Sequence, residues 1–224
     1  MEGETSRLKA LRPKLELRSR ILGAIFDFFR GRDYLAVETP IRIPAPAPEF
    51  HIEAISSAGW YLATSPEIHM KRLLSAGYSR IFQICKVFRD GERGRYHNPE
   101  FTILEWYREG AGYLDMVDET EDLVKYVALK ALGVAEIERG DYLLNLEPPW
   151  QRLTVKSAFE QFAGWLPGSD PDQDQFNMDL VERVEPMLDF SRPVVLLDYP
   201  ASLASLARLK PEDPTVAERF EVYA

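Results

Sequence analysis

The sequence predicts an α+β fold, and three observations carry that prediction. Residues 6–32 place apolar side chains at helical spacing, and residues 113–132 are rich in good helix formers. Between these segments, the strand-like runs 81–88 and 101–107 flank a polar loop that contains glycine, a pattern typical of a β-hairpin. At 224 residues, the chain is long enough for one domain with a substantial core.

Glycine and proline mark the ends of the first predicted helix and of the strand that follows it. Gly31 is a suitable stop for the helix over residues 6–32, and residues 34–40 then read as a strand that ends at Pro40. Residues 43–50 contain three alternating prolines, which favour an extended connecting loop. The apolar helical positions are Leu17, Ile21, Ala24, Ile25 and Phe28.

A second, shorter helix is predicted directly after Pro66. Either Thr64 or Ser65 supplies a hydroxyl that suits its N-terminal cap, and Pro66 suits its first turn. Glu67 lies near the positive end of the helix dipole, which by itself explains an acid at this position.

The helix predicted over residues 113–132 combines an apolar face with an acidic run near its start. We expect the acidic run to be a solvated face, favoured by the positive N-terminus of the helix. The predicted buried residues are Met116, Leu123, Val124, Val127 and Leu132. The acidic residues are Asp115, Asp118, Glu119, Glu121 and Asp122.

The last third of the chain is predicted to be an insertion followed by further elements of the same domain. Residues 134–175 contain turn signals and a short helix near residues 154–162, and we interpret them as an insertion within a single domain, 1–224. Residues 176–190 are expected to be helical, and residues 193–197 to form a short buried strand.

The predicted hairpin brings together the side chains with the most informative chemistry. Because side chains alternate along a strand, Phe101, Ile103, Glu105 and Tyr107 share one face. A carboxylate inside an otherwise apolar strand needs a partner, and a guanidinium such as Arg89 suits a carboxylate or phosphate. The alternative is that the charged residues between the two strands only form the solvated tip of a hairpin. The basic side chains of the loop are Arg89, Arg93, Arg95 and His97.

Composition restricts the classes of function. The net charge of −9 argues against a broad phosphate-binding surface. Cys85 has no second cysteine to pair with, and we expect it to be a small hydrophobic strand residue; three scattered histidines and this one cysteine predict no metal site. The polar first 20 residues and the lack of a long apolar run predict a cytoplasmic protein that is not in the membrane.

The order of residues around the hairpin resembles motif 2 of the class II aminoacyl-tRNA synthetases. The matching segments are Phe88-Arg89, then 97–102 (HNPEFT) and 105–107 (EWY). Within that class these residues resemble the lysyl-type enzymes, and they are most similar to the short paralogues that ligate β-lysine onto elongation factor P. The resemblance implies a class II catalytic fold, an antiparallel sheet flanked by helices.

The resemblance also implies a site for ATP and Mg²⁺. Arg89 matches the arginine that bridges the α-phosphate and the substrate carboxylate, and Phe101 matches the ring that stacks on adenine. Gly91 stands where the family usually has a glutamate that recognises the adenine amino group, with Glu92 beside it. The ATP-binding residues implied are Arg89, Asp90, Gly91, Glu92, Arg95, His97, Asn98 and Phe101.

The same resemblance implies lysine or β-lysine as substrate, elongation factor P as acceptor and a homodimer. The amino acid would be held by Ser65, Pro66, Glu67, Glu105 and Tyr107. The dimer interface would be the motif 1 helix and the strand ending at Pro40. We expect no tRNA partner, because the chain starts almost at motif 1, without the anticodon-binding domain of lysyl-tRNA synthetases.

Motif 3, with its second ATP-binding arginine, is absent from the sequence, which predicts a C-terminally incomplete catalytic fold. We therefore expect residues 1–224 alone to bind ATP weakly and to be inactive. Two alternatives remain open: a lysyl-tRNA synthetase core, and a non-catalytic dimerisation or binding module that kept the fold.

Overall fold

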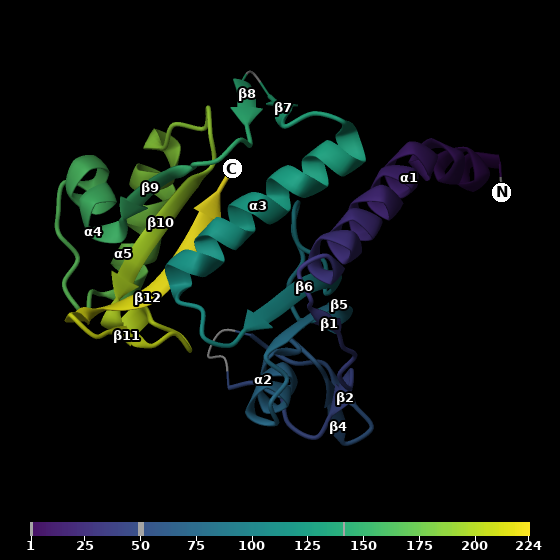
Figure 1. Ribbon diagram of the computed structural model, residues 1–224, viewed down its shortest axis with the longest axis horizontal. Helices are drawn as coiled ribbons and strands as arrows, with labels where there is room; N and C mark the ends of the chain where they lie inside the picture. Colours follow the sequence, from purple (N-terminus) through teal and green to yellow (C-terminus); the bar gives the residue numbers. More distant parts are fainter. Residues whose placement is uncertain (1, 49–51, 141) are drawn as a thin grey trace. The chain divides into compact units, whose positions relative to one another are not determined.

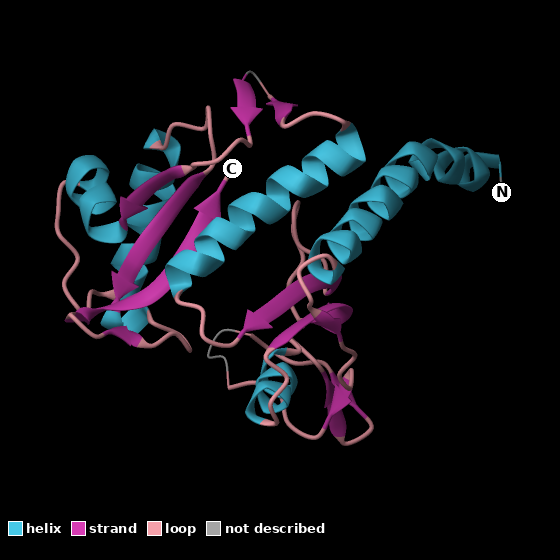
Figure 2. Cartoon of the chain, viewed as in Figure 1, coloured by secondary structure: helices cyan, strands magenta, loops and turns pink. Residues whose placement is uncertain are grey.

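The computed structural model describes residues 2–48, 52–140 and 142–224, and it forms two compact units (Figure 1). One unit is Phe26–Ala111, and the other combines Met1–Ile25 with Gly112–Ala224. Figure 2 shows that both units mix helices and strands, which confirms the predicted α+β class. The prediction of one domain over residues 1–224 stays a prediction. The end of the predicted 43–50 loop lies outside the described residues.

The unit Phe26–Ala111 is built on the predicted β-hairpin. Strands β5 (Arg80–Phe88) and β6 (Glu100–Arg108) pair antiparallel along their whole length, from Arg80 opposite Arg108 to Phe88 opposite Glu100. Helix α1 (Glu2–Arg30) precedes β1 (Leu35–Ala36), which adds to β5 in parallel. The hairpin and the first helix are therefore confirmed, each within a few residues of its predicted bounds.

Strand β1 is shorter than the predicted strand over residues 34–40, because a side chain replaces the main chain of β5 as hydrogen-bond acceptor. The Val37 N–H still donates to the Phe82 carbonyl at 3.0 Å. Two residues later the Thr39 N–H donates to the Gln83 side-chain oxygen at 3.1 Å instead. The regular ladder therefore ends before Pro40.

Aromatic packing fixes one face of the hairpin against the end of α1. Phe29 stacks on Phe82 with ring centroids 4.7 Å apart, and its ring lies 5.5 Å from that of Trp106. Phe82 and Trp106 are opposite each other in the β5–β6 register, so they share this face. The opposite face carries Phe101, Ile103, Glu105 and Tyr107, as the alternation predicted.

The rest of this unit is a small sheet and one helix. Strands β2 (Arg42–Ile43), β4 (Trp60–Leu62) and β3 (Ser56–Ser57) pair antiparallel in that order. Helix α2 (Glu67–Ser75) follows β4 after four residues and buries Met70. This short connection between β4 and α2 carries residues of the predicted site.

The other unit contains a four-stranded sheet that is covered on both faces. Its strand order is β11 (Leu209–Lys210), β12 (Asp213–Tyr223), β10 (Val194–Pro200) and β9 (Gln151–Thr154). Helix α3 (Tyr113–Leu132) lies on one face, and the segments around α4 (Val155–Ala158) and α5 (Gln173–Asp179) lie on the other (Figure 1).

Successive side chains of β10 pack on opposite faces of this four-stranded sheet. Val195 and Leu197 pack with Val117 of α3, while Val194 and Leu196 pack with Phe159 and other residues of the opposite layer. The predicted buried strand over residues 193–197 is confirmed. The further elements are β7 (Glu136–Arg139), β8 (Tyr142–Asn145), two π-helical segments (Phe159–Ala163 and Leu180–Val184) and two 3₁₀ turns (Glu185–Met187 and Ala201–Leu203).

The helical segments predicted near residues 154–162 and over 176–190 are confirmed as α4 with its π-helical extension, and as α5 with the turns that follow it. The segment 134–175 also supplies β9, which pairs in parallel with β10 from Gln151 to Thr154. Part of the predicted insertion is thus a strand of the four-stranded sheet.

Helix α3 has the predicted bounds, but its buried face differs from the prediction. Leu123 is buried, whereas Leu132 is 47 % exposed and Met116 is only half-buried. The prediction that the acidic run is a solvated face is wrong for Glu119 and Glu121, whose exposed fractions are 6 % and 3 %. The buried residues of the helix are Val117, Glu119, Glu121, Leu123, Ala128 and Ala131.

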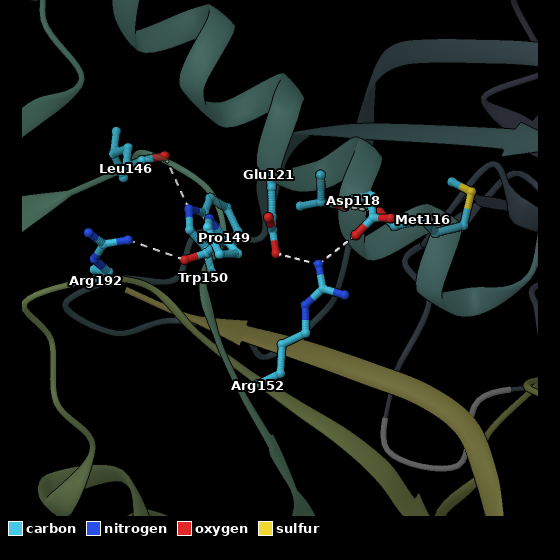
Figure 3. A network of polar contacts seen from close by, with 9 residues as sticks. Met116, Asp118, Glu121, Leu146, Pro149, Trp150, Arg152 and Arg192 are labelled. Atoms are coloured by element: carbon cyan, nitrogen blue, oxygen red, sulfur yellow. Dashed lines mark hydrogen bonds and ion pairs between the residues drawn. The ribbon is translucent and has the colours of Figure 1, made fainter.

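An arginine on β9 explains how Glu121 is buried. Arg152 contacts Glu121 at 2.7 Å and Asp118 at 2.5 Å, so one guanidinium bridges two acids on successive turns of α3 (Figure 3). The neighbouring Trp150 indole N–H donates to the Leu146 carbonyl at 3.1 Å. A buried carboxylate is stable only with a partner, and here the partner of Glu121 lies on β9. The ion pair therefore joins α3 to the sheet.

Removing this guanidinium is expected to destabilise the unit. Arg152→Ala leaves the buried Glu121 carboxylate without its ion-pair partner, which should lower the free energy of unfolding by about 1–3 kcal/mol. Urea denaturation followed by circular dichroism measures the change. Arg12→Ala, which breaks an ion pair with Glu16 on the exposed part of α1, is the matched control and should have a much smaller effect. Equal effects of the two variants would contradict the structural role of Arg152.

Candidate active site

The predicted site residues all lie within the unit Phe26–Ala111. They come from three places: the connection that leads into α2, the loop between β5 and β6, and the outward face of β6. Positions distant in sequence are joined by hydrogen bonds, as the contact between Ser65 and Glu105 shows.

The Glu105 carboxylate is held by two hydroxyl groups. The Ser65 hydroxyl donates to Oε1 at 2.6 Å, and the Tyr107 hydroxyl donates to Oε2 at 3.0 Å. Tyr107 lies two residues along the same strand face, while Ser65 comes from the connection before α2. The expectation that an acid in this strand needs partners is therefore confirmed.

Tyr107 is a persistent hydrogen-bond donor to this acid. Burial raises the pKa of the Tyr107 phenol far above its usual range, and the negative charges of Glu105 and Glu67 raise it further. The phenol therefore stays protonated and keeps its O–H for Glu105.

The connection before α2 is fixed by the same serine. The Ser65 hydroxyl accepts a hydrogen bond from the Glu67 N–H at 3.0 Å. The N-cap of α2 is Pro66, which makes no side-chain cap hydrogen bond, so the prediction that Thr64 or Ser65 caps this helix is wrong. The Thr64 hydroxyl is buried and has no hydrogen-bond partner among the described residues. On α2, Glu67 forms an ion pair with Lys71 at 2.6 Å.

Arg89 follows the end of β5 and has three neighbours. Its Nε donates to the Thr64 carbonyl at 3.3 Å, its guanidinium carbon lies 5.2 Å from the centre of the Phe101 ring, and its Nη1 lies 3.7 Å from Glu92 Oε1. The arginine is therefore fixed beside an aromatic ring. Such an arrangement can hold an anion next to a stacked planar group.

The loop between the strands turns back at a glycine. Gly91 has φ of +73°, a conformation that favours glycine, and its N–H is accepted by the Asp90 side chain at 2.9 Å. The side chains of Arg95, His97 and Asn98 are exposed on this loop. The structure therefore brings Glu92 to Arg89 but leaves these three at the surface.

Cys85 on β5 is half-buried rather than fully buried, and burial raises the pKa of its thiol. A raised pKa keeps the thiol protonated and weakens it as a nucleophile. The strand position agrees with the predicted packing role.

Two residues near the site were missed from the sequence. The Thr64 carbonyl anchors Arg89, and no sequence pattern reports where a main-chain oxygen points. Lys71 lies four residues after Glu67, and this spacing on a predicted helix could have indicated the ion pair. Among the helices of the described ranges, none combines the length and the apolar character needed to span a membrane.

Comparison with known proteins gives one consistent family. The sequence model of the family described as "tRNA synthetases class II (D, K and N)" matches residues 4–224. The chain is 37 % identical to the elongation factor P--(R)-beta-lysine ligase of Photobacterium profundum, over 94 % of this chain and 70 % of that protein. It is 39 % identical to the ligase of the same name from Vibrio atlanticus, with the same coverage.

Similarity also extends to proteins named for tRNA. The chain is 33 % identical to the lysine--tRNA ligase of Dehalococcoides mccartyi strain BAV1, over 91 % of this chain. Here the chain spans only 46 % of the relative's length.

The raised pKa of Tyr107 predicts a pH dependence of stability. Unfolding returns the phenol to a pKa near 10, so above about pH 10 the unfolded chain releases a proton that the folded chain keeps. Stability should therefore fall as the pH rises above about 10, and Tyr107→Phe should reduce this fall. Urea denaturation at pH 8 to 11 measures both. An unchanged pH slope in the variant would contradict the assignment.

Proposed function

The chain belongs to the class II tRNA synthetases of the D, K and N type, and on that premise we propose that it activates lysine or β-lysine with ATP and ligates it to a lysine of elongation factor P. The observation that carries this proposal is that Arg89 lies against the Phe101 ring, and that Phe101 and Glu105 share one face of β6, within one compact unit. It combines an anion-binding group and a flat ring with a carboxylate suited to an amine.

Arg89 would act at the reacting centre. In the activation step, the carboxylate of the amino acid attacks the α-phosphate of ATP and pyrophosphate leaves. Two anions that repel each other must be held together, and a guanidinium donates to both. The Nε contact with Thr64 and the Phe101 ring hold the arginine in place for this role.

ATP would bind along the loop and on the ring of Phe101. The residues proposed to contact it are Arg89, Asp90, Gly91, Glu92, Arg95, His97, Asn98 and Phe101. Glu92 already faces the site through its ion pair with Arg89, which supports its use in place of the usual glutamate at the position of Gly91. Mg²⁺ would be held by the ATP phosphates, because hard cations prefer oxygen ligands.

The amino acid would be held through its two ammonium groups. Glu67 at the start of α2 and Glu105 on β6 offer one carboxylate each, and the Tyr107 hydroxyl donates to Glu105. The substrate residues proposed are Ser65, Pro66, Glu67, Glu105 and Tyr107. A doubly charged diamine suits two acids better than a neutral amino acid does.

We favour elongation factor P as the acceptor because relatives named for it are 36–39 % identical to this chain, against 33 % for the lysine--tRNA ligases. The net charge of −9 also disfavours a long polyanion. The alternative, a lysyl-tRNA synthetase core, is supported by the match to the tRNA ligases.

We also propose a homodimer formed by α1 and the segment around β1. The first half of α1 is exposed, and its apolar side chains Leu8, Leu11 and Leu15 recur at helical spacing on one face. A cytoplasmic location stays a prediction.

Activation is tested on the full-length gene product by amino-acid-dependent pyrophosphate exchange. Arg89→Ala should lower the exchange rate by roughly 10²–10³, because it deletes charge stabilisation at the reacting centre. Arg208→Ala, which removes an exposed arginine paired with Glu218 in the other unit, should retain the rate.

The acceptor is tested by offering tRNA and elongation factor P together, with labelled lysine and β-lysine. Label on the protein supports the proposal. Charging of tRNA without label on the protein would favour the synthetase alternative, and no exchange with either amino acid would favour a non-catalytic module.

The dimer is tested with an apolar-to-charged substitution. Leu11→Glu places a charge in the middle of the exposed apolar face of α1, and should shift a dimer toward monomer. Light scattering at tens of micromolar measures the mass. A monomer mass for the unsubstituted chain would overturn the proposal directly.

A further inference from the structure

We propose that a cavity in the unit that contains β10 binds a small zwitterion, an amino acid whose carboxylate meets Lys156 and whose ammonium group meets Asp213. The cavity has a volume of about 180 Å³, and its lining residues all belong to this one unit. The candidate active site lies in the other unit, Phe26–Ala111. The inference is therefore independent of the proposed function.

The cavity is lined by four segments: the start of α4, the loop 167–169, the end of β10 and the start of β12. Strands β9 and β10 are parallel, and β9 leads directly into α4. Antiparallel β12 begins at the same edge of the sheet, where Val216 pairs with Pro200. The loop is fastened to the turn after β10, because the Ser202 N–H donates to the Ser169 carbonyl at 2.9 Å. The carboxyl ends of neighbouring parallel strands are a common position for ligand sites.

Lys156 and Asp213 bring opposite charges to this cavity, and both side chains are exposed. Hydrogen bonds from Thr215 lower the pKa of Asp213, and the positive charge of Lys156 lowers it further. Asp213 is therefore ionised at neutral pH. In the part of the chain that the structure describes, Lys156 forms no ion pair, although its charge acts on Asp213. The cavity thus has one cation and one anion that do not neutralise each other in a direct contact.

A second acid of the wall, Asp198, is already balanced by other groups. The Tyr113 hydroxyl donates to its Oδ1 at 2.8 Å, and Lys210 Nζ lies 2.9 Å from its Oδ2. Its φ of +59° occurs where the register between β10 and β12 shifts. Because Lys210 compensates this carboxylate, the charges available to a ligand are those of Lys156 and Asp213. A zwitterion matches this pair better than a simple anion or a simple cation does.

The volume of the cavity and its apolar wall limit the ligand to a small amino acid. A volume of about 180 Å³ corresponds to about six water molecules at about 30 Å³ each. Alanine is of this size, whereas a nucleotide is much too large. The apolar part of the wall includes Val155, Pro167 and Val216, which suits a short apolar side chain.

The test measures the binding of L-alanine and of two analogues that each lack one of its charges. Propionate lacks the ammonium group, and ethylammonium lacks the carboxylate. We expect alanine to bind with a Kd in the millimolar range and each analogue to bind at least about tenfold more weakly, because each loses a charge-assisted contact. Saturation-transfer NMR of the ligand with the whole chain measures the three affinities. Equal binding of either analogue, or no binding of alanine, would overturn the inference.

Two substitutions locate the binding of alanine. Lys156→Met and Asp213→Asn should each weaken it about tenfold. Both side chains are exposed, so the melting temperature should change little. Lys14→Met, at an exposed position of α1, is the matched control and should bind alanine as the unsubstituted chain does.

Arg89→Ala separates this cavity from the candidate active site. Because Arg89 lies in the other unit, its removal should leave the affinity for alanine unchanged. Loss of alanine binding in this variant would assign the binding to the active site and overturn the inference, as would unchanged affinity in either cavity variant. Failure of pyrophosphate exchange, by contrast, would count against the proposed function alone.

Discussion

The Glu105 carboxylate, placed inside an otherwise apolar strand, is the constraint on which the candidate site depends. An ionised acid in such a place is stable only if hydrogen-bond donors meet it. Tyr107 supplies one donor from the same strand face, and Ser65 supplies the other from the connection before α2. The conformation of that connection, and hence the start of α2, follows from this requirement.

The positive charge of the site, on Arg89, is positioned by different contacts from those of Glu105. Arg89 is held by a main-chain carbonyl, an aromatic face and one acid, contributed by Thr64, Phe101 and Glu92 respectively. Thr64 is adjacent to Ser65, so the same connection contacts both the cation and the anion of the site. Two opposite charges are in this way positioned from one short segment of backbone.

A comparison of half-buried Glu105 with buried Glu121 separates function from structure. Glu121 on α3 is neutralised by the guanidinium of Arg152, and the contact fastens a helix to a sheet. Glu105 instead accepts hydrogen bonds from two uncharged hydroxyls, those of Ser65 and Tyr107. This difference in partners supports the proposed binding of a substrate amine at Glu105, whereas the ion pair of Glu121 is part of the scaffold.

The sequence by itself determined the hairpin, the helices and the face that carries Phe101, Glu105 and Tyr107, because strand and helix periodicity are local properties of the chain. It did not determine the burial of Glu119 and Glu121, since an acidic run on a helix reads as solvated until its neighbours are known. The shortened β1 and the Thr64–Arg89 contact were also decided only in the tertiary structure. Each depends on where a side chain or a carbonyl from a distant segment points, and local pattern does not carry that information.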